Sequence, residues 1–178
     1  MSHAFALIAE GYAAQPTLAH ALIRELADAA GSRRLIGGQM EDVLAEKKSD
    51  ATPEELEFIH LNKTAAMIEA ALVMGGLLGG ERPGPTLTQL RRAGRHLGLA
   101  FQIIDDILDA TADTATLGKT AGKDAKADKT TFAKLHGLEA SRRFAAELST
   151  AARAALDKLP GDKSFLFALI TAMAARSN

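Results

Sequence analysis

Three carboxylates stand close together in the segment 102–109, which reads Gln-Ile-Ile-Asp-Asp-Ile-Leu-Asp. On a helix the side chains of Asp105, Asp106 and Asp109 project toward one sector, because Asp109 follows Asp105 by four residues and Asp106 by three. Like charges at this spacing repel one another, and apolar neighbours make an uncompensated charge costlier. Oxygen ligands suit Mg²⁺, with Mn²⁺ as an alternative, and Mg²⁺ binds one or two carboxylates together with phosphate oxygens. The segment therefore predicts metal-bridged diphosphate binding; the alternative is a solvated acidic helix face.

Three further segments carry side chains that suit a diphosphate site. Residues 37–42 read Gly-Gly-Gln-Met-Glu-Asp, Lys63 and Thr64 lie in the middle of an apolar helix, and residues 117–131 form a lysine-bearing stretch. Lysines bind phosphate oxygens, and Gln and Thr donate neutral hydrogen bonds beside them. Each feature has a simpler interpretation: Lys63 extends its ammonium to solvent, the glycine pair allows close helix packing, and the loop lysines form a solvated basic run.

The elements that must position these residues are predicted to be helices. Hydrophobic residues make up 47% of the chain and aromatic residues 4%, and no stretch alternates like a strand. We expect turns or loops over 79–85 and 111–129. The expected longer helices cover about residues 4–12, 16–31, 33–48, 52–78, 86–110, 137–159 and 163–176. A short helix is expected to begin at about residue 130.

Two helix starts carry capping-box sequences. Thr52-Pro53-Glu54-Glu55 is expected to open the helix with Lys63, and residues 86–89, Thr-Leu-Thr-Gln, the helix with the aspartates. Both predictions fix the ends of the elements that carry the candidate site.

Composition excludes several other kinds of site. The net charge of the 178-residue chain is −1, which gives no electrostatic argument for nucleic acid, and the absence of cysteine excludes disulfides and thiolate sites. The histidines lack metal-ligand spacing, and neither a nucleophilic triad nor a Walker-type loop is found. The most apolar run, residues 65–80, is interrupted by Glu69 and by glycines, so we expect no membrane span. With no signal-peptide pattern, the expectation is a soluble, cytoplasmic protein.

The motifs taken in order resemble those of the trans-isoprenyl diphosphate synthases, the polyprenyl synthetase family. They are GGQxxD at 37–42, KT at 63–64, GLAFQxxDDxLD at 98–109, LGKxxGKD at 117–124 and DKTT at 128–131. The resemblance covers essentially the whole chain, is strongest to short-chain members such as farnesyl diphosphate synthases, and matches the family's C-terminal portion. It implies an all-α fold, a helical bundle of the isoprenoid synthase type, with residues 1–178 as the C-terminal part of one domain.

The resemblance also implies roles for individual residues. Asp105, Asp106 and Asp109 match the family's second aspartate-rich motif, which binds Mg²⁺. The residues implied in catalysis are Lys63, Gln102 and Lys119, and those implied in substrate binding are the same three together with Gln39, Thr64, Phe101 and Lys129; Asp42 pairs with Gln39 along the cavity.

The implied activity is head-to-tail condensation of isopentenyl diphosphate with an allylic diphosphate, dimethylallyl or geranyl, to a product such as farnesyl diphosphate. Family members carry another aspartate-rich motif on an earlier helix, and this sequence has only the one at 105–109. We therefore expect a chain that lacks the N-terminal helices, is inactive alone and self-associates, as a homodimer or otherwise. The alternatives are a non-catalytic partner subunit of a heteromeric synthase and a terpene cyclase, whose downstream metal triad is not found.

Overall fold

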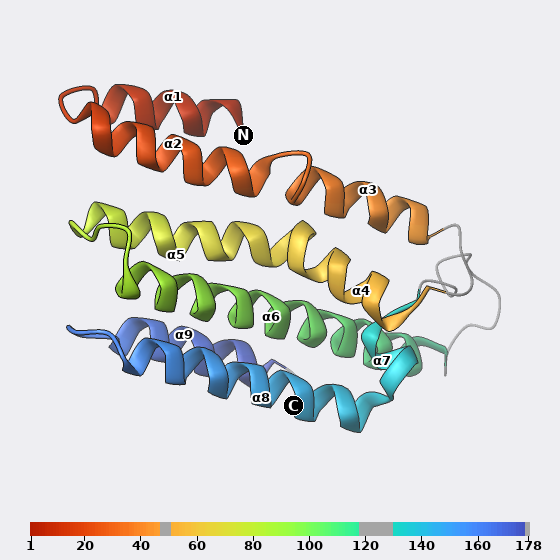
Figure 1. Ribbon diagram of the computed structural model, residues 1–178. Coiled ribbons are helices and arrows are strands. Elements are labelled where there is room, and N and C mark those ends of the chain that lie inside the picture. Colours follow the sequence, from red (N-terminus) through yellow and green to blue (C-terminus); the bar gives the residue numbers. More distant parts are fainter. Residues whose placement is uncertain (47–50, 118–129, 177–178) are drawn as a thin grey trace.

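The computed structural model describes residues 1–46, 51–117 and 130–176, and over these ranges its regular elements are helices, without a strand (Figure 1). The predicted all-α fold is therefore confirmed. The elements are α1 (Ser2–Gly11), α2 (Pro16–Ala30), α3 (Leu35–Ala45), α4 (Pro53–Ile59), the π-helix η1 (His60–Ala65), α5 (Ala66–Leu78), α6 (Pro85–Leu117), α7 (Phe132–His136), α8 (Leu138–Asp157) and α9 (Ser164–Ala175).

The helices pack in successive layers (Figure 1). The outer helix α1 packs on α2, and α2 and α3 lie on the continuous run α4–η1–α5. This run in turn packs on α6, whose other side contacts α7, α8 and α9. The largest core cluster joins α5, α6, α8 and α9 around fully buried Val73, Leu156 and Ile170. Helix α6 is thus the central element, and the aspartate motif lies in its C-terminal half.

The helix ends agree with the prediction in one case and differ in another. Thr52 caps α4, because its hydroxyl accepts a hydrogen bond from the Glu55 amide while the Glu55 carboxylate accepts one from the Thr52 amide. The second capping box is wrong. Helix α6 begins one residue earlier, at Pro85, whose fixed φ suits a first helical position, and the Thr88 hydroxyl donates to the Gly84 carbonyl.

Two further boundaries differ from the sequence-based expectation. The loop expected from Thr111 is helical as far as Leu117, and Thr111 is accommodated inside the helix because its hydroxyl donates to the carbonyls of Ile107 and Leu108. The predicted helix over 52–78 is interrupted by the π-helical segment η1. Such segments are rare and occur frequently at functional sites.

The continuous helical run Pro53–Leu78 is long and apolar enough to cross a membrane by length and composition alone, although the same test is passed by core helices of soluble proteins. Here the run packs between α2 and α3 on one side and α6 on the other. The expectation that no segment spans a membrane stays a prediction.

Candidate functional site

The three aspartates of the α6 motif lie in two kinds of surroundings. Asp105 is partly exposed and Asp109 exposed, one helical turn apart on the same face. Asp106 is 7% exposed, and its Oδ2 accepts a hydrogen bond of 2.8 Å from the backbone amide of Phe132. The imidazole of His60 lies 3.6 Å from the same oxygen. Asp106 therefore ties α6 to η1 and to the first turn of α7, while Asp105 and Asp109 are accessible to a ligand.

The π-helix η1 places Lys63 and Thr64 between α3 and α6. The Lys63 ammonium contacts Oδ2 of buried Asp42, on α3, at 2.5 Å. The Thr64 hydroxyl donates to Oε1 of Gln102, on α6, at 2.8 Å. Gln102 precedes Asp105 by three residues, so these contacts join α3, η1 and α6 about one helical turn from the aspartates.

Two glycines make this close approach possible. A Cβ atom at Gly38 would lie 2.3 Å from the backbone nitrogen of Lys63, and one at Gly98 would lie 2.4 Å from the Cα of Ala65. Any larger side chain at either position would push η1 away from α3 or α6. The predicted close packing at the glycine pair is therefore confirmed at Gly38, and it serves to hold Lys63 and Thr64 in place.

Arg176, just after α9, also reaches the aspartates. Its guanidinium lies 3.2 Å from Oδ1 of Asp105 and 5.5 Å from the centre of the Phe101 ring. Arg176 is not predicted from the sequence, because a single arginine near the end of the chain belongs to no motif. This contact shows that the Asp105 carboxylate stabilises a positively charged group beside it.

The acidity of Asp105 reflects the same surroundings. Burial raises the pKa of Asp105 above its usual range; the charge of Arg176 opposes this rise, and the charge of Asp109 adds to it. A cation placed between the two carboxylates would relieve both the burial of charge and the repulsion.

The donor set fits Mg²⁺ with Asp105 and Asp109 as carboxylate ligands. In the part of the chain that the structure describes, no group of three or more His, Asp or Glu side chains is arranged to hold a metal by itself. Since Mg²⁺ takes one or two carboxylates and completes its shell with water and phosphate oxygens, two accessible carboxylates are sufficient. Asp106 as a third metal ligand stays a prediction, because its described hydrogen bond goes to Phe132.

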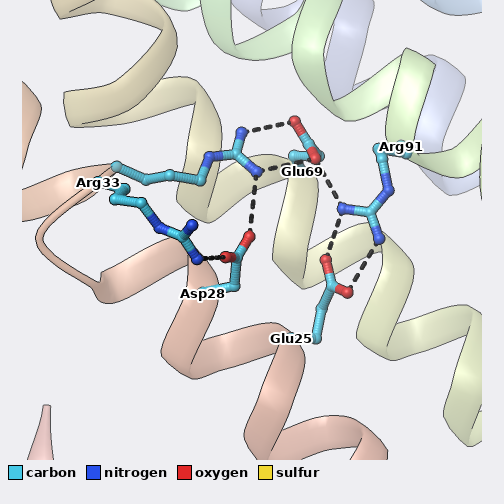
Figure 2. Close-up of polar contacts among 6 residues, drawn as sticks. Glu25, Asp28, Arg33, Glu69 and Arg91 are labelled. Atoms are coloured by element: carbon cyan, nitrogen blue, oxygen red, sulfur yellow. Dashed lines mark hydrogen bonds and ion pairs between the residues drawn. The ribbon is translucent and has the colours of Figure 1, made fainter.

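A network of ion pairs holds α3 against the neighbouring helices. Glu69, on α5, is 4% exposed and accepts hydrogen bonds from Arg34 at 3.1 and 2.8 Å and from Arg91 at 2.7 Å. Arg91, on α6, also binds Glu25, on α2, through two hydrogen bonds of 2.7 and 2.9 Å (Figure 2). The network links the start of α3 to α2, α5 and α6, and so fixes the helix that carries Gly38 and Asp42.

The remaining predicted residues are placed as follows. Phe101 is partly buried and lies beneath Arg176, whereas Gln39 is exposed on α3. Lys119 and Lys129 lie outside the described residues, so their roles stay predictions. Besides Arg176, sequence reasoning missed His60 and Phe132. Only the three-dimensional packing of η1 and α7 shows their link to Asp106.

Comparison with known proteins places these features in a family. The polyprenyl synthetase family model matches residues 1–164. Among curated relatives, a chloroplastic geranylgeranyl pyrophosphate synthase from Catharanthus roseus is 44% identical over 158 residues, which cover 88% of this chain and 44% of the relative. A chloroplastic heterodimeric geranylgeranyl pyrophosphate synthase large subunit 1 from Arabidopsis thaliana is 46% identical, covering 88% of this chain and 43% of the relative. The chain thus spans less than half the length of these two relatives.

Solved structures agree with the fold. An FPP/GFPP synthase from Zymomonas mobilis in apo form matches with a TM-score of 0.82 and 28% identity, covering 97% of this chain and 57% of that one. A geranyltransferase from Helicobacter pylori, complexed with magnesium and isoprenyl diphosphate, matches with a TM-score of 0.76 and 30% identity, covering 98% and 56%. The predicted isoprenoid synthase type of helical bundle is confirmed.

One expectation from the sequence is wrong. The cytoplasmic location is contradicted by the relatives from Catharanthus roseus, Capsicum annuum and Arabidopsis thaliana, which are chloroplastic enzymes. The sequence-based expectation rested only on missing signals, and such an absence does not locate a protein.

Proposed function

The chain belongs to the polyprenyl synthetase family of prenyltransferases, and from that premise we propose that it forms the second-aspartate-motif half of a trans-prenyl diphosphate synthase. The intact protein would condense isopentenyl diphosphate with an allylic diphosphate in a Mg²⁺-dependent, head-to-tail reaction. The observation that carries the proposal is the packing of α3, η1 and α6, which joins Lys63 to Asp42 and Thr64 to Gln102, one helical turn before the accessible carboxylates Asp105 and Asp109.

The described residues supply binding and orientation. Asp105 and Asp109 would hold Mg²⁺, which when bound neutralises the charge of the allylic diphosphate and promotes its departure. Lys63, positioned by Asp42, would place a positive charge beside the allylic diphosphate. Gln102, positioned by Thr64, would offer its amide to orient the substrate. Lys119 and Lys129 would add phosphate contacts and Phe101 an apolar wall. Gln39, exposed three residues before Asp42, would contact substrate from the α3 side.

The product and the assembly belong to the proposal. The relatives include geranylgeranyl diphosphate synthases, and a structural neighbour is an FPP/GFPP synthase, so we propose a short-chain product, farnesyl or geranylgeranyl diphosphate. We propose that residues 1–178 form part of one helical domain and that turnover needs a first aspartate-rich motif, which this sequence lacks. A non-catalytic subunit is the second candidate, supported by the Arabidopsis relative that is a subunit of a heterodimeric synthase.

Condensation of labelled isopentenyl diphosphate with geranyl diphosphate tests the proposal, with Mg²⁺ or EDTA present. We expect Mg²⁺-dependent product when a chain with the first aspartate-rich motif completes the site, and its loss in Asp105→Asn. Asp157→Asn, an exposed substitution on α8, serves as the matched control. Equal activity of Asp105→Asn would contradict the proposed role of the motif. Product formed by this chain alone would contradict the requirement for a first motif.

A further inference from the structure

A cavity lies beside the candidate site and has His60 and Phe132, the two residues that contact Asp106, among its lining residues. It has a volume of about 460 Å³, is open to solvent and is lined by residues of α4, η1, α6, α7 and α8. Figure 1 shows α7 at the end of the bundle where α4, α6 and α8 also come together. Pockets for small ligands fall mostly between about 300 and 1,000 Å³. The residues that line it are Pro53, Glu54, Glu57, His60, Leu99, Ile103, Phe132, His136, Phe144, Glu147, Leu148 and Ala151.

The walls of this cavity are apolar and aromatic. Phe132, His136 and Phe144 form a ring cluster, with centroids 4.4 to 5.8 Å apart and Phe132 edge-on to Phe144. Ile103 forms part of the wall from α6. Phe144 keeps 38% of its surface exposed although it is a large apolar side chain, which leaves an aromatic surface open to a ligand.

Besides His60 and His136, the titratable side chains that line the cavity are carboxylates. Glu54, Glu57 and Glu147 line it, and among its described lining residues there is neither lysine nor arginine. Glu147 lies 4.0 Å from Arg143, but both side chains are more than 60% exposed, so the pairing is weak. Carboxylates next to aromatic faces favour a cation, through charge attraction and through the ring quadrupole.

The cavity is also coupled to the aspartate motif. Two of its lining residues, His60 and Phe132, are the two that contact Oδ2 of Asp106, at 3.6 and 2.8 Å. A ligand that displaces His60 or Phe132 would move the link of Asp106 to η1 or to α7. Binding in the cavity would therefore change the position of the neighbouring Asp105.

We propose that this cavity is a binding site for a small amphiphilic cation, with its apolar body between Ile103 and Phe144 and its cationic head at Glu57 and Glu147. The proposal rests on the cavity itself and not on the proposed prenyl transfer. It predicts a ranking of matched ligands by charge, which a non-specific apolar surface would not produce.

Calorimetric titration with three matched ten-carbon probes below their micelle concentrations tests the proposal. We expect decyltrimethylammonium to bind about tenfold or more tightly than decanol, a difference of about 1.4 kcal/mol, and decanoate to bind most weakly. Glu57→Gln/Glu147→Gln should remove this preference, whereas Glu139→Gln, exposed on α8 outside the cavity, should keep it.

Two further measurements distinguish a site from surface adsorption. Ala151→Phe should fill the cavity and weaken all three probes, with circular dichroism checking that the variant is folded. In the wild-type protein, the amide resonance of Phe132 should shift on binding of the ammonium probe, because that amide donates to Asp106. Equal affinity for the three probes, a preference for decanoate, or an unchanged preference in the double Gln variant would overturn the proposal.

Discussion

At the scale of single residues, neighbouring aspartates in the motif have different tasks. Asp105 faces outward toward Arg176, whereas Asp106 is buried and holds the amide of Phe132. The sequence predicts that three carboxylates share a sector of the helix, but it does not predict which carboxylate accepts a hydrogen bond from the protein's own backbone. That assignment depends on α7, a five-residue helix whose position is set by packing.

This difference predicts opposite phenotypes for two substitutions. Asp105→Asn should weaken Mg²⁺-dependent diphosphate binding and change the free energy of unfolding by less than about 0.5 kcal/mol, because the side chain is partly exposed. Asp106→Ala should lower the free energy of unfolding by about 1–3 kcal/mol, because it leaves the Phe132 amide without its acceptor. Urea unfolding and calorimetry measure both quantities; equal loss of stability in the two variants would contradict the division.

At the scale of elements, the structure depends on the close approach of η1 to α3 and α6. We expect Gly38→Ala to cost about 1–3 kcal/mol of stability, since its Cβ would meet backbone atoms of Lys63 that cannot yield cheaply. The variant should also weaken diphosphate binding, because Lys63 and Thr64 would shift with η1. Thermal unfolding and calorimetry give the two values.

Gly75→Ala is the matched control for this prediction. Gly75 lies inside α5, and a Cβ there would have no atom within 4 Å. The substitution should therefore stabilise the protein by up to about 1 kcal/mol through helix propensity alone. If Gly38→Ala behaved in the same way as Gly75→Ala, the close approach would not limit stability.

The ion-pair network predicts how stability depends on pH. Burial would raise the pKa of Glu69, but hydrogen bonds and charges from Arg34 and Arg91 outweigh burial and lower it. A depressed carboxyl pKa stabilises the fold above the unfolded value, about 4.3, and this contribution is lost as pH falls through the lower, folded pKa. Wild type should therefore lose more stability than Glu69→Gln on acidification below about pH 4.

Urea unfolding between pH 3 and pH 7 measures this difference. At pH 7 Glu69→Gln should be less stable by about 1–3 kcal/mol, because two arginines lose a charged acceptor. Glu10→Gln, exposed on α1, should follow the wild-type profile. Parallel profiles for wild type and Glu69→Gln would show that the network does not contribute through the Glu69 charge.

At the scale of the whole molecule, the sequence predicts the helical class and most of the elements, but not the contacts between them. Apolar periodicity locates α2 and α8 within about two residues, because it depends only on neighbours along the chain. The π-helical segment and the continuation of α6 past Thr111 depend on contacts with other helices or on a side chain bonding back to its own helix. Arg176 reaches Asp105 only because α9 packs beside α6.

The exposed face of α3 predicts self-association of this chain. Four apolar side chains at spacings of three and four residues form a stripe, and they are 38–60% exposed: Ile36, Met40, Val43 and Leu44. We expect concentration-dependent dimers or larger species in analytical ultracentrifugation, and fewer in Ile36→Ser/Met40→Ser. Phe165→Ser, which removes an even more exposed apolar side chain on α9, should leave association unchanged. A wild-type monomer at high concentration would contradict this prediction.

The central claim is that α3, η1 and α6 build a Mg²⁺-dependent diphosphate site around Asp105 and Asp109. Titration of geranyl diphosphate into the purified chain, with Mg²⁺ or with EDTA, tests it most directly. We predict binding that requires Mg²⁺ and that falls at least about tenfold, or about 1.4 kcal/mol, in Asp105→Asn/Asp109→Asn. Equal affinity in EDTA, or an unchanged affinity in a folded double variant, would contradict the account.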